Sequence, residues 1–492
     1  MAKDFIVAIE LGSSKMTGIA GRKNPDGSIT ILASATEDST SYIRKGVVYN
    51  IDKTAQGLSN IITKLKNTLQ ADITQVYVGI GGQSIRSVKN VIIKDLPLDA
   101  IVSQDMVNEL MDTNRNMTYP DYEIQDAVTE EYKVDSQYQT DPVGIQAIRL
   151  EGNFLNILWR RSFYRNLNKS FDNAGIAIAE TYLAPLVMAD NVLTEAEKRA
   201  GCVLVDLGAE TTTVSVYYRD KLRNIAVIPL GNNNITKDLE SLQMDEVEAE
   251  QMKRKYASAY TDVKDIDPTL MLPVEHDRMD GSRTVSNSRL IEVVEARMRE
   301  IIENVRNLIP SEYIDKLLGG IILTGGGSNM RDIEKAFRAY INIEKVRVAK
   351  FVTLNINTKD SKPELKHDGT MNTILSLVAR GDMNCAGREF SDSLFSDDHF
   401  GAAPAAQPAQ PVNAAPAASV QQPAATIDAA AKAAQEQAAA KAAAAKAEAE
   451  AEEARLRKEA EEKASLREQR KSKLLGSVKK FFGSIFEPDP NE

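Results

Sequence analysis

Two stretches of the chain repeat one order of residue types that suits phosphate binding. Each has an apolar strand, a carboxylate, Leu-Gly, small hydroxyl residues and a second strand, in FIVAIELGSSKMTGI at 5–19 and CVLVDLGAETTTVSV at 202–216. The glycine lets the backbone approach an anion, and the amides and hydroxyls that follow can bond to phosphate oxygens. The pattern predicts two phosphate-binding hairpins, with candidate residues Gly12, Ser13, Ser14, Gly208, Thr211 and Thr212.

The two carboxylates of these stretches, Glu10 and Asp206, stand at the same place in the pattern. We expect them to face each other across a cleft, where they could hold a hydrated Mg²⁺. One such stretch is more often an ordinary β-turn. Two copies roughly 195 residues apart favour a duplicated phosphate site.

A third glycine-rich turn lies in GGIILTGGGSNMRDIEKAF at 319–337. A short apolar strand runs into Gly325, Gly326 and Gly327, and a helix with early acidic residues follows. A plain strand-to-helix turn needs one glycine and seldom three. Three in a row predict bare backbone held close to a flat or charged ligand.

The elements that position these motifs alternate between strands and amphipathic helices from residue 1 to about 383, which indicates an α/β unit in two halves. Residues 84 to about 160 break the alternation, because strand-like runs at 88–93, 132–134 and 144–150 surround one helix. The helices are expected at 54–71, 104–115, 162–174, 188–199, 246–260, 288–309 and 331–340.

Composition agrees with a large cytosolic protein. With 492 residues, 43% of them hydrophobic, the chain can bury more than one core. Two cysteines and three scattered histidines cannot build a disulfide framework or a zinc site. The start is a strand rather than a signal peptide, and no run of 18 apolar residues exists. A net charge of −10 argues against nucleic-acid binding.

The chemistry changes after residue 383. Residues 384–427 are rich in Ala, Pro, Gln and Ser, which predicts a disordered linker. Residues 428–470 turn to Ala, Glu, Lys and Arg with little apolar bulk, so a lone, charged, Ala-rich helix is favoured over a coiled coil. At 1.5 Å per residue this spacer helix would reach about 65 Å.

The segment 471–486, KSKLLGSVKKFFGSIF, has an apolar face at helical spacing and added positive charge. It predicts an amphipathic helix that lies in an anionic membrane surface. The alternative is docking onto its own globular part or onto a partner's groove. The membrane-facing candidates are Leu474, Leu475, Val478, Lys479, Lys480, Phe481, Phe482, Ile485 and Phe486.

The three glycine motifs, in this order, resemble the actin, Hsp70 and sugar-kinase superfamily, whose members bind ATP between two phosphate hairpins and an adenosine loop. Further stretches narrow the resemblance to the FtsA family of bacterial cell-division proteins, as a divergent member. These stretches are DPVG at 141–144, PLGNNNITKDL at 229–239, AEQMK at 249–253, SRLIEVVEARMREII at 288–302 and the tail at 471–486.

The resemblance implies an actin-like two-domain ATPase fold, α/β in class, with an inserted subdomain called IC. Domain I would take 1–83 and 166–199, subdomain IC 84–165, domain II 200–365 and a closing helix of domain I 366–383, followed by the linker, spacer helix and membrane helix.

The resemblance also implies residue roles. Ser13, Ser14 and Lys15 would meet phosphates from the first hairpin, and Gly208, Thr211 and Thr212 from the second. Gly325 to Gly327 would meet the ribose and α-phosphate, and Glu250 and Lys253 would line the adenosine. Arg297 and Glu300 would receive the C-terminal tail of the tubulin-like ring protein FtsZ; the alternative is a solvated ion pair.

Departures from the family pattern bear on hydrolysis. Glu10 replaces the usual aspartate, Ala209 and Glu210 replace glycines of the second hairpin, Asn232 replaces a glycine after Gly231, and Ser376 stands where a glycine is usual. A carboxylate at Glu210 would repel a γ-phosphate unless it turns away or binds the metal. Glu210 is therefore a candidate, with Glu10 and Asp206, for positioning the metal or the attacking water. We therefore expect Mg·ATP binding with weak or absent hydrolysis.

Two function classes remain. The first is a membrane-tethered, ATP-binding, actin-like polymer that anchors the FtsZ ring to the inner face of the cytoplasmic membrane at the division site and recruits other division proteins. Subdomain IC would supply one contact face of a head-to-tail filament. The second is a phosphotransferase or a pilus-assembly-type ATP-binding protein of the same superfamily. The spacer and tail favour the first, because a small-molecule kinase has no use for a membrane anchor.

Overall fold

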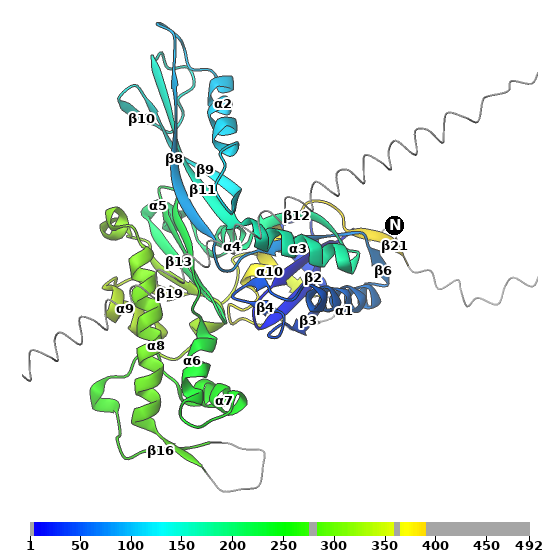
Figure 1. The fold of residues 1–492 in the computed structure, drawn as a ribbon, viewed down its shortest axis with the longest axis vertical. Coiled ribbons are helices and arrows are strands. Elements are labelled where there is room, and N and C mark those ends of the chain that lie inside the picture. The colour runs from blue at the N-terminus through cyan, green and yellow to red at the C-terminus, as the bar shows by residue number, and fades with distance from the viewer. Residues whose placement is uncertain (1–3, 275–282, 359–364, 390–492) are drawn as a thin grey trace, which may run out of the picture. The chain divides into compact units, whose positions relative to one another are not determined.

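The computed structural model describes residues 4–274, 283–358 and 365–389. These residues form two halves, each built around a β-sheet (Figure 1). The predicted linker beyond 389, the spacer helix at 428–470 and the membrane helix at 471–486 lie outside the described residues. No helix within the described ranges is long and apolar enough to cross a bilayer.

The first half has a six-stranded sheet with helices on both faces. Gly18 of the second strand meets α1, whereas Gly21 meets Val378 of α10, so these two helices cover opposite faces. Helix α3 packs on α1, and α4 packs on α10. The strands, in sheet order, are β12 (Ala177–Leu183), β7 (Gln75–Ile80), β1 (Ile6–Leu11), β2 (Lys15–Lys23), β3 (Ile29–Asp38) and β20 (Ile356–Thr358), and the helices are α1 (Ile51–Leu69), α3 (Arg161–Ala174), α4 (Ala184–Val192) and α10 (Asn372–Arg380).

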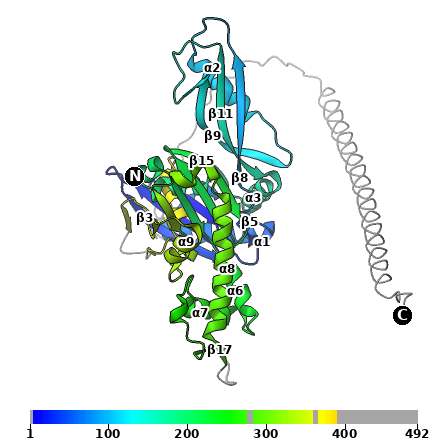
Figure 2. The same cartoon turned by 90° about the vertical axis from the view of Figure 1, so that its left-hand side faces the viewer.

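The second half is built on five strands of the other sheet. Parallel pairing of β13 with β18 and antiparallel pairing of β13 with β14 repeat the arrangement of β7, β1 and β2 in the first half. Figure 2 shows α8 running past α6 and α7 to β17. The elements are β13 (Cys202–Leu207), β14 (Thr212–Tyr218), β15 (Lys221–Ile228), β18 (Gly320–Thr324), β19 (Val346–Val348), β17 (Thr284–Ser286), α6 (Asn232–Glu240), α7 (Glu246–Tyr256), α8 (Asn287–Leu308) and α9 (Ile333–Ile341).

The segment predicted to be inserted forms a separate layer that we call the inserted subdomain. It comprises β8 (Arg86–Asp95), α2 (Gln104–Arg115), β9 (Tyr122–Val134), β10 (Gln137–Gln139) and β11 (Arg149–Arg160). Its strands extend the second sheet through one residue pair, Arg86 with Ala226 of β15, and it has its own apolar core. The predicted strands at 88–93 and 132–134 fall inside β8 and β9, whereas 144–148 precede β11.

The helix bounds predicted from the sequence agree with the structure for most helices. Helix α2 occupies the predicted 104–115, because Ser103 accepts from the amide of Met106 and caps its first turn. The single helix predicted at 188–199 is wrong: α4 ends at Val192, and α5 (Glu195–Ala200) begins after Thr194. Thr194 and Glu197 form a capping box, which starts a new helix rather than continuing the old one.

The predicted start of the linker at 384 is also wrong. Cys385 is buried and its amide donates to the carbonyl of Phe5 (2.8 Å). Strand β21 (Ala386–Glu389) then pairs with β6 (Ala71–Ile73). Composition could not find this strand, because its partner lies more than 300 residues earlier in the chain.

Candidate functional site

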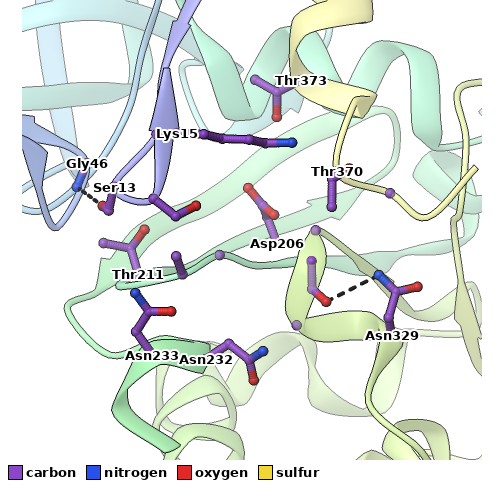
Figure 3. Close-up of a pocket in the computed structure, with 18 of the residues that line it drawn as sticks. Ser13, Lys15, Gly46, Asp206, Thr211, Asn232, Asn233, Asn329, Thr370 and Thr373 are labelled. Carbon is purple, nitrogen blue, oxygen red and sulfur yellow. Dashed lines mark hydrogen bonds between the residues drawn. The ribbon is translucent and has the colours of Figure 1, made fainter. Parts of the chain in front are cut away.

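A cleft of about 650 Å³ lies where the two halves meet, and the predicted motifs line it. Figure 3 shows Ser13 and Lys15 approaching from the first half, with Asp206 and Thr211 opposite them. Residues of α6, α7 and the short helix η3 (Gly326–Asn329) complete the lining. The cleft therefore brings together segments from both ends of the described chain.

The two predicted hairpins have the same backbone turn. The amide of Gly12 donates to the carbonyl of Lys15 (3.1 Å), and the amide of Gly208 donates to the carbonyl of Thr211 (2.9 Å). A Cβ at Gly12 or Gly208 would lie 2.7 or 2.9 Å from that same carbonyl oxygen. Both turns therefore require glycine because of this carbonyl, and the approach of an anion to them stays a prediction.

The hydroxyl residues do not all face the cleft. Ser13, Ser14, Lys15 and Thr211 line it, whereas Thr212 does not. The buried Thr212 hydroxyl donates to the carbonyl of Leu230 (2.9 Å), so the phosphate contact predicted for Thr212 is wrong. Side chains alternate along a strand, which turns position 212 inward.

Thr213 lines the cleft and was missed. Two-residue alternation, counted from the Asp206–Thr213 pair of the β13–β14 ladder, would have found it.

Glu10 and Asp206 both line the cleft and are partly buried. Burial, followed by the charge of Asp206, raises the pKa of Glu10 to about 7, although Lys15 and Thr373 oppose this rise. Burial raises the pKa of Asp206 to about 6. Two carboxylates that resist losing both protons favour a cation between them.

Within the described residues no group of three or more His, Cys, Asp or Glu side chains could hold a metal ion. The pair fits a hydrated Mg²⁺ whose remaining ligands are water and phosphate, which is the usual way that this ion binds in nucleotide sites.

The third glycine turn packs directly on the second hairpin. Gly325 has φ +82°, and a Cβ there would lie 2.3 Å from Oδ1 of Asp206. A Cβ at Gly327 would lie 2.9 Å from the Cβ of Leu207. Gly326 has only Thr370 nearby, at 3.4 Å from a Cβ, so it presents bare backbone to the cleft. Two of the three glycines thus allow close packing, and Gly326 stays open to a ligand.

Lys253 and Glu250 form a polar cluster at the α7 side of the cleft. The ammonium of Lys253 lies 2.5 Å from Oε2 of Glu250 and donates to Oγ1 of Thr236 (2.7 Å). Burial lowers the pKa of Lys253, and Glu250 opposes that shift. Burial also opposes ionisation of Glu250, but hydrogen bonds from Lys253 and Arg254 outweigh it and lower its pKa. Both side chains line the cleft, as predicted.

Other residues of the lining were not predicted from the sequence to face the cleft. Asn232 and Asn233 begin α6 within the quoted stretch 229–239, so helix-start reasoning could have found them. The side chain of Asn329 donates to the carbonyl of Gly326 (3.2 Å). The segment 366–373 adds lining residues without any motif: Lys366, Asp368, Gly369, Thr370 and Thr373.

Glu210 does not line the cleft. Its carboxylate turns away and accepts from the amide of Lys45 (2.7 Å). The sequence left two possibilities for Glu210, turning away from the phosphate or binding the metal. In the structure the carboxylate turns away, so its predicted role in positioning metal or water is wrong.

A second hollow, of about 380 Å³, lies between α6 and α8, and Arg297 and Glu300 line it together with Val293 and Ala296. The guanidinium of Arg297 binds both carboxylate oxygens of Asp238 on α6 (2.6 and 2.9 Å) and also pairs with Glu300. These bonds raise the pKa of Arg297. Arg297 therefore does not form only a solvated pair with Glu300. Its main partner is Asp238, which the sequence analysis did not identify.

Comparison with known proteins points to one family. The family profile described as "Cell division protein FtsA" matches residues 203–368, and that of the "SHS2 domain inserted in FTSA" matches 82–158. The chain is 31% identical to the cell division protein FtsA of Porphyromonas gingivalis, over 67% of this chain and 69% of the relative. It is 32% identical to that of Neisseria meningitidis, over 67% of this chain and 80% of the relative.

Among solved structures, one titled "PilM-PilN type IV pilus biogenesis complex" is similar in fold, with TM-score 0.52, 15% identity, and coverage of 76% of this chain and 98% of the other.

Proposed function

The chain belongs to the FtsA family of cell division proteins, and from that premise we propose that it is an ATP-binding, actin-like protein that polymerises and tethers the FtsZ ring to the membrane. The observation that carries the nucleotide part is the duplicated hairpin with its two carboxylates, closed by the glycine turn of η3. Membership of this family argues against the phosphotransferase and pilus-assembly alternatives.

The proposed roles follow from position in the cleft. Amides and hydroxyls of Ser13, Ser14 and Thr211, with Lys15, would hold the β- and γ-phosphates. Gly326 would approach the ribose and α-phosphate, and Glu250 and Lys253 would border the adenosine. Glu10 and Asp206 would hold Mg²⁺ through water, and the ion would supply positive charge to the phosphates. With Glu10 in place of aspartate, we expect slow turnover.

Calorimetric titration of the full chain with ATP tests the nucleotide proposal. We expect binding with Mg²⁺ and weaker binding after chelation, and steady-state turnover far below the roughly 1–100 per second of kinases. Absence of any ATP affinity would remove the proposal.

The hollow between α6 and α8 is proposed to receive the C-terminal tail of FtsZ. Val293 and Ala296 offer apolar contact, and Arg297 and Glu300 flank them with charge. Arg297→Glu should weaken binding of an FtsZ-tail peptide at least about tenfold, because it reverses one of the charges that flank the apolar contact. Arg289→Glu is the matched control, since Arg289 is exposed on the same helix and pairs only locally with Glu292. Equal binding by both variants in fluorescence anisotropy would place the FtsZ site elsewhere.

Membrane attachment is proposed for the helix predicted at 471–486. The double variant Phe481→Glu, Phe482→Glu should abolish co-sedimentation with anionic liposomes and leave ATP binding intact. Deleting 428–470 should change only the gap between membrane and filament, because the spacer sets reach rather than affinity. A double variant that still pellets with lipid would put the anchor in another segment.

Self-association is proposed to use the inserted subdomain as one contact face of a head-to-tail filament. No residue of 84–165 lines the cleft, so a folded chain without this segment keeps every residue of the cleft lining. Filaments on lipid, viewed by electron microscopy, should be lost from this deletion while ATP titration still shows binding. Unchanged filaments would move the contact to another face. Recruitment of further division proteins is part of the same proposal.

A further inference from the structure

Glu210 crosses from the second phosphate hairpin to a turn of the first half. Its Oε2 accepts from the backbone amide of Lys45 at 2.7 Å, and its Oε1 lies 3.7 Å from the ammonium of Lys237. The Glu210 side chain is only 20% exposed, although it belongs to a turn. The contact joins residues 165 positions apart in the chain.

The turn that receives Glu210 is the two-residue loop of a short hairpin. Lys45 and Gly46, between β4 (Ile43–Arg44) and β5 (Val47–Val48), both have positive φ, at +50° and +71°. Positive φ at both central residues is the backbone of a two-residue hairpin turn, here between the antiparallel strands β4 and β5. The amide of Lys45 donates to Glu210, and the amide of Gly46 donates to Oγ of Ser13 (2.7 Å). One turn therefore holds both phosphate hairpins.

The same turn is fixed from behind. The amide of Gln83 donates to the carbonyl of Lys45 (2.8 Å), and a Cβ at Gly46 would lie 2.5 Å from the Cα of Gly82. The segment with Gly82 and Gln83 leads directly into β8 of the inserted subdomain. The turn at 45–46 is thus a junction of three parts: the two hairpins and the start of the inserted subdomain.

We propose that Glu210 is a positioning residue that clasps the second hairpin to this turn and holds the phosphate side of the cleft closed without nucleotide. The first hairpin has Ser14 at the equivalent place, as the matched pairs Leu11–Met16 and Leu207–Thr212 show, and a serine is too short for this reach. The inference rests on the proposed nucleotide site and assigns a regulation to it.

The consequence concerns exchange of nucleotide. A ligand can shift a conformational equilibrium only by its differential affinity for the two states. If Glu210 already holds the cleft closed, nucleotide binding changes the closure little and must wait for the clasp to open. Both association and dissociation should then be slow.

The test compares the full chain with Glu210→Gln, which keeps the shape but loses the charge of the acceptor, and Glu210→Ser, which copies Ser14. Glu303→Gln, an exposed i,i+4 pair partner on α8, is the control. Hydrogen exchange of 43–48 and 207–213 is measured without nucleotide, and stopped-flow rates are measured with a fluorescent ATP analogue and Mg²⁺. Circular dichroism checks that each variant is folded.

In Glu210→Ser we expect the amide hydrogens of 43–48 and 207–213 to exchange about tenfold faster than in the unchanged protein, because one charge-assisted hydrogen bond is lost. Glu210→Gln should be intermediate, and the control unchanged. Association and dissociation of the analogue should both quicken in Glu210→Ser.

If the folded Glu210→Ser and Glu210→Gln chains keep the original exchange at 43–48, the clasp does not exist. If no chain binds the analogue, the nucleotide proposal fails, while the exchange data still decide the clasp. Faster exchange with unchanged analogue rates would also overturn the regulation that we infer.

Discussion

The two hairpins at Gly12 and Gly208 share a backbone and differ in nearly every side-chain contact. Both turns close with a glycine amide bonded to a carbonyl three residues later, in the same ladder register. In the first, Ser13 bonds to Gly46 and Lys15 extends into the cleft (Figure 3). In the second, Ala209 offers no hydroxyl, and the carboxylate of Glu210 leaves the cleft for Lys45.

The repeated pattern therefore specifies the backbone turn and not the chemistry of its side chains. In both hairpins a backbone amide donates to a backbone carbonyl to close the turn, whichever side chains the turn carries. The first hairpin adds the positive charge of Lys15, and the second adds the clasp of Glu210. Both hairpins still place a carboxylate, Glu10 or Asp206, at the same position of the cleft lining.

The largest effect on nucleotide affinity should come from removing one of the two carboxylates at equivalent positions of the hairpins. Asp206→Asn should weaken Mg·ATP binding about 100-fold, equivalent to roughly 2.7 kcal/mol, because the hydrated ion loses a charged partner. Calorimetric titration with Mg²⁺ is the measurement.

The control for Asp206→Asn is the same titration with chelator. There the variant should bind ATP no worse than the unchanged chain, since a negative charge near phosphate has gone. An equal loss with and without Mg²⁺ would mean that Asp206 holds the fold or the nucleotide rather than the ion.

The next effect concerns the raised pKa of Glu10, about 7 in the folded chain against an ordinary 4.5. Between these values the unfolded chain has released the proton and the folded chain retains it, so stability without nucleotide falls as pH rises. In the unchanged chain the free energy of unfolding should fall by an amount on the order of 1–3 kcal/mol over this pH range, and Glu10→Gln should remove that fall. Urea unfolding at about pH 5 and about pH 7.5 measures it. Parallel pH profiles for Glu10→Gln and the unchanged chain would contradict it.

A smaller effect separates two neighbouring threonines of the second hairpin. Thr211→Val should weaken Mg·ATP binding several-fold, because its hydroxyl faces the cleft. Thr212→Val should leave affinity unchanged but lower the free energy of unfolding by about 1 kcal/mol, because the carbonyl of Leu230 loses its donor. Calorimetry and urea midpoints on both variants distinguish them. Reversed roles would place Thr212 in the cleft.

The smallest effect should come from Lys237→Ala. Its ammonium lies 3.7 Å from Glu210 and its side chain is 62% exposed, so the pair contributes less than about 0.5 kcal/mol. The dissociation rate of nucleotide should change less than about twofold. A change as large as that of Glu210→Ser would mean that the ion pair, rather than the amide of Lys45, positions Glu210.

Local pattern alone determined much of this protein. The strand–carboxylate–glycine order identified both hairpins, and the three glycines identified the turn of η3, because each motif consists of neighbours whose backbone needs are visible in the residue types. Helices α2 and α8 were found to within a residue for the same reason: apolar spacing, joined in α2 by the Ser103 cap, acts over a few residues.

The partners of these motifs depend instead on tertiary packing. The carboxylate of Glu210 could have met a metal, a phosphate or solvent, and it meets the amide of Lys45, 165 positions away. Arg297 has a local partner in Glu300, yet its two-point contact is with Asp238 on another helix. Strand β21 exists because β6 offers an open edge to it. Such partners are chosen by the packing of distant segments, and no pattern of neighbouring residues records them.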